Sequence, residues 1–239
     1  MRIIGIIGGM SAESTALYYA RLNAEVRRRL GGLHSARVVI WSVDFAEIEE
    51  MQSAGRWDDA GQLLAETAVR LVHAGAEVIV LATNTMHKIA PAIEAAVSVP
   101  FLHVADATAH EIQASGFRRP GLIGTRYTME EDFYIGRLRD RFGLDVLVPD
   151  APERAEINHI IFDELCCGIT KETSRQRYVE LAERLGAAGA DSLILGCTEV
   201  GMLLNAGNVP MPVFDTTLIH VDAALEWALD DVATKEGRG

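Results

Sequence analysis

The sequence has few of the features that mark membrane, secreted or nucleic-acid-binding proteins. No uninterrupted apolar run approaches the ~20 residues of a membrane-spanning helix, although 49% of the 239 residues are hydrophobic. The apolar segment 3–7 is too short and too glycine-rich for the core of a secretory signal. We therefore expect a globular protein with a sizeable buried core and no membrane partner.

Cysteine and positive charge are both scarce. The chain has three cysteines, and two of them, Cys166 and Cys167, are adjacent. We therefore expect no disulfide framework and predict a reduced cytoplasm as the compartment. The chain has 22 Lys and Arg against 34 Asp and Glu, a formal charge of −12. This balance disfavours nucleic acid and anionic membranes as partners. It permits an acidic substrate, because a cleft can be rich in hydrogen-bond donors while the surface stays acidic.

Several common catalytic motifs are missing from the sequence. The glycines of segment 5–9 do not form G-x-G-x-x-G, and neither a phosphate-binding P-loop nor a G-x-S-x-G elbow occurs. The seven histidines never take H-x-x-x-H or H-E-x-x-H spacing. We therefore expect no bound metal.

The sequence instead alternates short apolar runs, Gly or Asn turns and amphipathic stretches. This alternation is typical of parallel strands joined by crossover helices, and therefore of an α/β fold. The predicted strands are 3–7, 38–43, 78–82, 101–104, 121–123, 144–148, 193–195 and 213–214.

The chain also repeats itself in sequence. Any two strand–helix units look somewhat alike, but several matches in the same order, with an offset that drifts by only two residues each time, favour internal duplication. The repeat predicts two lobes with parallel sheets, related by a pseudo-twofold axis. The predicted lobes are 1–98 plus 212–239, and 99–211. The matches are 5–8 with 121–124 (offset 116), 74–81 with 188–195 (offset 114) and 99–101 with 211–213 (offset 112).

The duplication places two polar segments at equivalent strand ends, where ligands bind in open parallel sheets. Thr83-Asn84-Thr85 follows the predicted strand 78–82, and Cys197-Thr198-Glu199 follows 193–195 at the 114 offset. A pseudo-twofold axis would present Thr83 and Cys197 to the two faces of one bound molecule. Inversion at a carbon atom requires this arrangement, because one group removes a proton and another returns it from the opposite side.

Cys197 is the candidate base. A helix N-terminus after the strand would lower the pKa of the thiol from its ordinary value of ~8.5, and free backbone N–H groups there could hold a carboxylate. The alternative is an inert buried cysteine, which the polar match in the other half makes less favoured. Cys166 and Cys167, before Gly168 at a predicted helix end, are assigned to packing. His87 is expected to brace the turn after Thr83 rather than act as a base.

Four segments together resemble the cofactor-independent aspartate/glutamate racemases. The resemblance covers nearly the whole chain, and the two later strand-end motifs at this spacing are its most specific part. The segments are Gly8-Gly9-Met10-Ser11, Asn84-Thr85-Met86-His87, Gly124-Thr125 with Thr128, and Gly196-Cys197-Thr198-Glu199.

This resemblance implies two Rossmann-like lobes with the active site in the crevice between them. It also implies an isomerase that needs neither pyridoxal phosphate nor metal, with a thiol from each lobe beside the substrate α-carbon. Cys197 matches one thiol, and Thr83 stands where the family commonly has the other. Relatives with this Thr/Cys pair resemble racemases that favour the L-enantiomer. A homodimer is also the family's common state. The implied substrate-binding residues are Met10, Asn84, Thr85, Thr125, Tyr127, Thr128 and Thr198.

Some questions stay open at this point. Aspartate and glutamate differ by one methylene, and no Arg or Lys is matched to the side-chain carboxylate, Arg126 being the nearest candidate. A single-thiol enzyme on the same scaffold, of the maleate isomerase or decarboxylase type, is one alternative function. A non-catalytic carboxylate-binding protein is the other.

Overall fold

The structure, a computed structural model, describes residues 1–236, with side chains described through Asp230. The chain divides into two compact units: Met1–His103 together with the segment from His220 onward, and Val104–Ile219. Each unit holds one parallel sheet, so the predicted α/β class with two parallel sheets is confirmed. Among the described residues, no helix is long and apolar enough to cross a membrane.

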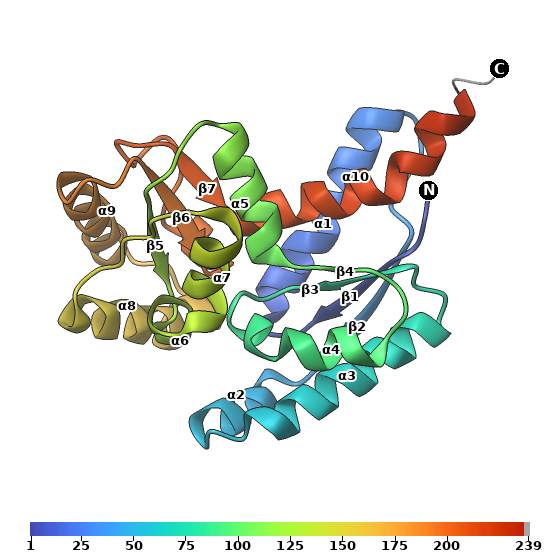
Figure 1. The fold of residues 1–239 in the computed structure, drawn as a ribbon, viewed down its shortest axis with the longest axis horizontal. Helices are drawn as coiled ribbons and strands as arrows, with labels where there is room; N and C mark the ends of the chain where they lie inside the picture. Colours follow the sequence, from blue (N-terminus) through green and yellow to red (C-terminus); the bar gives the residue numbers. More distant parts are fainter. Residues whose placement is uncertain (237–239) are drawn as a thin grey trace. The chain divides into compact units, whose positions relative to one another are not determined.

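The sheet of the first unit has the strand order β2-β1-β3-β4 (Figure 1). Alternate strand residues enter two cores: Ile7 and Ile79 pack beneath α2, α3 and α4, whereas Ile6 and Val80 pack beneath α1 and α10. Both faces of the central strands are therefore covered, which explains their continuous apolar sequence. The elements are β1 (Ile4–Gly8), α1 (Ala12–Leu30), β2 (Val38–Ser42), α2 (Phe45–Ser53), α3 (Trp57–His73), β3 (Val78–Leu81), η1 (Thr85–Ile89), α4 (Ala90–Ala96), β4 (Phe101–Leu102) and α10 (Thr216–Glu236).

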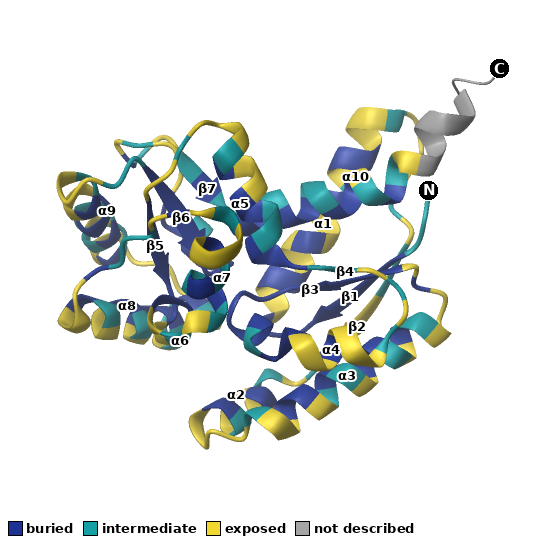
Figure 2. Ribbon diagram, viewed as in Figure 1, coloured by how far each residue is buried: buried dark blue, intermediate teal, exposed yellow. Residues whose placement is uncertain are grey.

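The sheet of the second unit has the order β5-β6-β7. Its helices turn apolar faces to one core and polar faces outward, as the banding in Figure 2 shows. The elements are α5 (Val104–Ala114), β5 (Pro120–Gly124), α6 (Arg126–Glu130), α7 (Asp132–Phe142), α8 (Ala151–Asp163), η2 (Leu165–Cys167), α9 (Glu172–Ala187), β6 (Ser192–Gly196), η3 (Val200–Met202) and β7 (Val213–Asp215).

The strand registers follow the internal repeat of the sequence. Gly5 lies opposite Ile79 in the first sheet, and their counterparts Gly121 and Leu193 lie opposite each other in the second. The next strand continues the match, since Ile79 pairs with Phe101 and Leu193 pairs with Val213. The two sheets thus share one register across three strands, as duplicated units should.

Two strand predictions need correction. Segment 144–148 is not a strand, because only Leu147 bridges to Gly121. Its N–H and carbonyl bond to β5, but Pro149, which has no N–H, follows two residues later and cannot extend the ladder. The strand predicted at 101–104 ends at Leu102, because Val104 already begins α5.

The compact units differ by a few residues from the predicted lobes 1–98 plus 212–239 and 99–211. Along the chain, the first boundary between the units falls at His103–Val104 and the second at Ile219–His220. The physical reason is that β4 and β7, which follow Pro100 and Pro212, still pair with β3 and β6 of the unit they are leaving.

His220 fastens α10 to the first unit. Its Nε2 donates to the carbonyl of Leu102 (2.8 Å), and its Nδ1 accepts from the Tyr18 hydroxyl (2.9 Å). The ring is fully buried, and this burial lowers the pKa of His220 to about 4. A neutral imidazole with one donor and one acceptor satisfies both neighbours, whereas a charged ring would lose the bond from Tyr18.

His220 should therefore contribute to acid unfolding. Its pKa is lower in the folded than in the unfolded chain, so its contribution is complete above about 6.5 and is lost as the pH falls towards 4. The full loss is about 3 kcal/mol. Denaturant unfolding across this range should show a shallower pH dependence for His220→Gln than for the wild type. The exposed His34 supplies the control, and equal slopes for His220→Gln and His34→Gln would contradict the assignment.

Candidate active site

In the first unit, two of the predicted site segments lie next to each other. Strands β1 and β3 pair in parallel, with Ile7 opposite Leu81, so the turns after them share one edge of the sheet. The N–H of Ala82 extends this pairing by donating to the Ile7 carbonyl (2.9 Å). The sequence-predicted residues that these turns carry, all of them buried, are Met10, Thr83, Asn84 and Thr85.

The turn after β1 depends on glycine. Gly9 has a φ of +94°, and a Cβ there would lie 2.2 Å from the carbonyl oxygen of Val43. Any other residue would strain the backbone and push the turn away from the end of β2. Ser11 then caps α1 by accepting a bond from the Ser14 N–H (3.2 Å).

The second unit brings its own predicted residues together in the same way. Gly124 and Gly196 are paired at the ends of β5 and β6. A Cβ on Gly124 would lie only 2.7 Å from the Gly196 carbonyl oxygen, so glycine lets the two strand ends approach. Thr125 follows one strand, and Cys197 with Thr198 follows the other, all of them buried.

The Thr125 hydroxyl caps the short helix α6. It accepts a bond from the Thr128 N–H (3.3 Å) and lies 3.1 Å from the Thr128 hydroxyl. Thr128 is fully buried. The pair forms a small hydroxyl cluster beside the strand end that carries Cys197.

Cys197 has a charged partner that the sequence analysis did not assign a role. Its thiol donates to Oε2 of Glu199 (2.9 Å), and the Thr198 hydroxyl donates to the same oxygen (2.7 Å). Glu199 is 3% exposed and Cys197 is 7% exposed, so water contributes little to either group. The signal available in the sequence was an acidic residue two positions after a cysteine, directly following an apolar strand.

The expected lowering of the Cys197 pKa is wrong. Burial raises the pKa of this thiol well above its ordinary value, and the negative charge of Glu199 raises it further. The helix that follows, η3, is a single turn of three residues. Its weak dipole cannot offset desolvation and an adjacent carboxylate. The resting group is therefore a thiol hydrogen-bonded to Glu199.

His87 braces the Thr83 turn, as predicted. Its Nδ1 lies 2.7 Å from the Thr83 carbonyl oxygen, and its backbone N–H donates to the Asn84 carbonyl (3.1 Å). The ring is buried.

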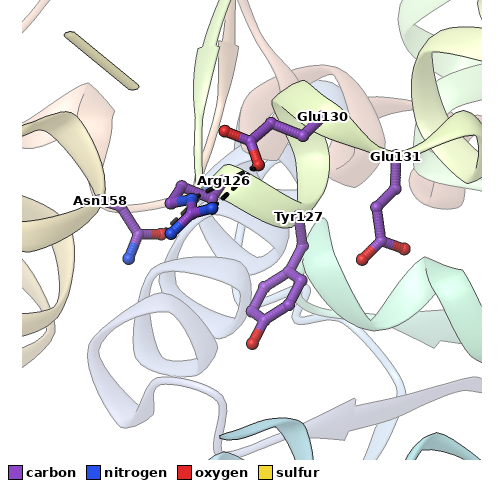
Figure 3. A pocket seen from close by; sticks show the side chains of 5 residues that line it. All are labelled: Arg126, Tyr127, Glu130, Glu131 and Asn158. Carbon is purple, nitrogen blue, oxygen red and sulfur yellow. Dashed lines mark hydrogen bonds and ion pairs between the residues drawn. The ribbon is translucent and has the colours of Figure 1, made fainter. Parts of the chain in front are cut away.

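Tyr127 and Arg126 line a pocket of about 290 Å³ with Glu130, Glu131 and Asn158 (Figure 3). The Arg126 guanidinium is paired with Glu130 (3.3 Å). Glu130 also binds Arg154 (3.0 Å), whose hydrogen bond is the main reason that the pKa of Glu130 is lowered. Arg126 is thus engaged with a protein carboxylate in this structure.

The adjacent cysteines differ from each other. Cys166 packs against the core of the second unit, as predicted, but Cys167 is exposed. The packing assignment is therefore wrong for Cys167. Helix α8 ends at Asp163, and the tighter 3₁₀ turn η2 carries Cys167 outward before Gly168 (φ +71°) ends it.

No three His, Cys, Asp or Glu side chains converge as a metal site would within the described part of the chain. The strand ends of the first unit carry hydroxyls and one amide, and those of the second unit carry hydroxyls, one thiol and one carboxylate. Hydroxyl and amide groups can bind carboxylates, and a thiol beside a carboxylate can move protons.

Comparison with known proteins extends these observations over nearly the whole chain. The family model described as Asp/Glu/Hydantoin racemase matches residues 7–224, which include every predicted site residue. The broad specificity amino-acid racemase RacX of Bacillus subtilis (strain 168) is 23% identical over 228 residues, covering 90% of this chain and 93% of that protein.

Two solved structures are closely similar. A candidate Asp/Glu racemase of Yersinia pestis is 53% identical, with a TM-score of 0.90, covering 96% of this chain and 100% of the other. An aspartate racemase homologue of Pyrococcus horikoshii OT3 is 37% identical, with a TM-score of 0.82 and the same coverage.

The charge of Glu199 can be tested through the thiol it faces. In Glu199→Gln, the pKa of Cys197 should fall below its wild-type value because the carboxylate charge is gone, while burial keeps it above that of a free thiol. Thiolate absorbance during alkaline titration, read as the difference from the same protein carrying Cys197→Ala, measures this shift. Glu172→Gln, on the exposed start of α9, is the control. An unchanged titration in Glu199→Gln would refute the electrostatic assignment.

Proposed function

The chain belongs to the Asp/Glu/hydantoin racemase family, and we propose that it is a cofactor-independent racemase of aspartate or glutamate that works most readily from the L-enantiomer. It is an enzyme of the amino-acid racemase type, since the proteins it matches are racemases. The observation that carries the proposal is the buried thiol–carboxylate pair of Cys197 and Glu199. Such a pair can exchange one proton without cofactor or metal.

The first step of the proposed reaction uses that pair. Substrate binding displaces remaining water, and the Cys197 thiol passes its proton to the Glu199 carboxylate. The resulting thiolate removes the α-proton of the L-amino acid and becomes a thiol again. Glu199 thus supplies the acceptor that the raised pKa of Cys197 requires, because solvent alone would leave little thiolate near neutral pH.

The second step returns a proton from the opposite face. We assign this role to Thr83, which occupies the position equivalent to Cys197 in the repeat. Its hydroxyl delivers its proton to the α-carbon and recovers one from solvent. Glu199 releases to solvent the proton that it accepted in the first step, so that Cys197, Glu199 and Thr83 all regain their starting states. Donors near the substrate carboxylate would stabilise the enediolate charge that develops between the two steps. For this we assign Asn84, Thr85, Thr125, Thr128, Thr198 and the backbone N–H groups of the strand ends, with Met10 and Tyr127 as lining residues.

The Thr83/Cys197 pair makes the two faces unequal. A hydroxyl is a far weaker acid and base than a thiol, so the carbanion returns to the L-form more often than it inverts. The equilibrium constant between enantiomers is unity, and therefore kcat/KM for racemisation must be equal in both directions. The preference for the L-enantiomer consequently lies in proton exchange, which is faster from L than from D.

Thr83 also favours a second candidate. If the hydroxyl takes no part, one thiol remains, which suits an isomerase or decarboxylase of the single-thiol type acting on an unsaturated or dicarboxylic acid. Such an enzyme would not exchange the α-proton of an amino acid, so the assay below separates the two functions. It also separates both from a protein that only binds carboxylates.

Exchange of the substrate α-proton should depend on Cys197, and Cys166 serves as the control cysteine. In deuterium oxide the wild type should replace the α-proton of L-aspartate or L-glutamate with deuterium, as seen by NMR. In Cys197→Ala this exchange rate should fall by about 10²–10⁴-fold, which is the usual contribution of a general base. Cys166→Ala should stay within a few-fold. Retention of a tenth of the wild-type rate by Cys197→Ala would exclude it as the base.

The hydroxyl face can be tested by restoring a thiol. Thr83→Cys should raise racemisation in both directions about tenfold or more, since a thiol is the better acid and base. It should also bring exchange from the D-enantiomer towards the rate from L. NMR of α-proton loss, run beside optical rotation for both enantiomers, measures this. Equal exchange of L and D by the wild type would contradict the assignment, because Thr83 would already serve as an adequate base.

A further inference from the structure

Three histidines are buried together behind the Thr83 turn. His87, His103 and His220 are 2%, 5% and 0% exposed. The ring centroid of His87 lies 4.4 Å from that of His103 and 5.9 Å from that of His220, and Phe101 flanks it at 5.5 Å. The proposed reaction uses none of these rings. Buried polar rings require a reason, because each must find hydrogen-bond partners away from water.

The contact between His87 and Thr83 determines where the ring proton must be. Nδ1 of His87 lies 2.7 Å from the Thr83 carbonyl oxygen. A carbonyl oxygen can only accept, so Nδ1 must carry the hydrogen and donate it. Because the His87 N–H also donates to the Asn84 carbonyl, His87 holds two successive peptide groups, Thr83–Asn84 and Asn84–Thr85.

The neighbouring rings keep His87 in place. His103 and Phe101 pack beside it from β4 and the residue that follows, and His220 packs from α10. His220 is itself fixed by its bonds to Leu102 and Tyr18. Close packing on several sides leaves the His87 ring little freedom to rotate away from the carbonyl.

The corresponding place in the second unit is built differently. At the offsets of the repeat, Gly201 stands for His87 and Asp215 stands for His103. A Cβ on Gly201 would lie 2.7 Å from Oδ2 of Asp215, so no ring could fit there. The Cys197 carbonyl accepts instead from the backbone N–H of Val200 (3.1 Å). The ring brace therefore belongs to the hydroxyl half of the repeat alone.

We propose that His87 is a positioning residue for Thr83, and that its Nδ1–H bond to the Thr83 carbonyl places the hydroxyl for protonation of the D-face. This inference rests on the proposed function. An error of about 1 Å in a reacting group can cost on the order of 10²-fold. Because a hydroxyl is already the weaker acid, proton transfer on this face depends strongly on accurate placement.

Two substitutions separate this role from general support of the fold. His87→Gln removes the donor from the Nδ1 position, whereas His87→Asn keeps an amide N–H close to it. His87→Gln should lower racemisation in both directions, and exchange from the D-enantiomer, about tenfold or more. Exchange from the L-enantiomer, which depends on Cys197, should stay within about twofold. His87→Asn should recover most of the D-side rate.

The outcomes against the inference are distinct. Unchanged D-side exchange in His87→Gln would overturn it, and so would an equal fall in L-side exchange, which would indicate damage to the whole protein. A wild type that exchanges neither enantiomer would instead overturn the proposed function.

A measurement on the unaltered protein covers the case in which the variants do not fold. Nitrogen NMR of ¹⁵N-labelled histidine rings reports which nitrogen carries the proton. The structure requires neutral His87 to be protonated at Nδ1, the opposite of His220, whose Nε2 donates to Leu102. A neutral His87 ring protonated at Nε2 would overturn the inference whatever the activity.

Discussion

The parallel register of the central strands is the constraint on which the rest of the structure depends. In each unit it decides which turns share the carboxyl edge of the sheet: those after β1 and β3 in one, and those after β5 and β6 in the other. Paired glycines at Gly124 and Gly196 let the ends of β5 and β6 approach each other. The positions of the polar residues in the candidate site are set by that register, because each of these residues lies within a few residues of a strand end.

Burial then determines the chemistry available at those edges. A thiol and a carboxylate in water would titrate independently, but Cys197 and Glu199 are enclosed and share a hydrogen bond. Loss of water and the negative neighbour both favour the neutral thiol. In our proposal, the hydrogen-bonded Glu199 is the acceptor to which the resting thiol passes its proton when the thiolate forms.

The repeat shows how one backbone plan can support two unequal faces. The strand registers of the two units correspond, yet the side chains that follow β3 and β6 at equivalent positions differ. Thr83 corresponds to Cys197, and the ring of His87 corresponds to Gly201 beside the Asp215 carboxylate. In our proposal, the half with the weaker acid has the more elaborate brace, because accurate placement is the remaining means of speeding a proton transfer from a hydroxyl.

The sequence by itself determined the α/β class, the two parallel sheets, the strand-end location of the polar segments and the family. These features depend on local patterns: apolar runs, glycine turns and a repeat that three matches reveal. The bracing role of His87 was also predictable, because four residues separate the ring from its acceptor. The tertiary structure decided what depends on surroundings. It showed that 144–148 is not a strand, since pairing ends before Pro149, and that Cys167 is exposed, since a 3₁₀ turn replaces the end of a helix. It also reversed the predicted pKa shift of Cys197, because the cost of burial and the position of Glu199 are set by packing that no local pattern specifies.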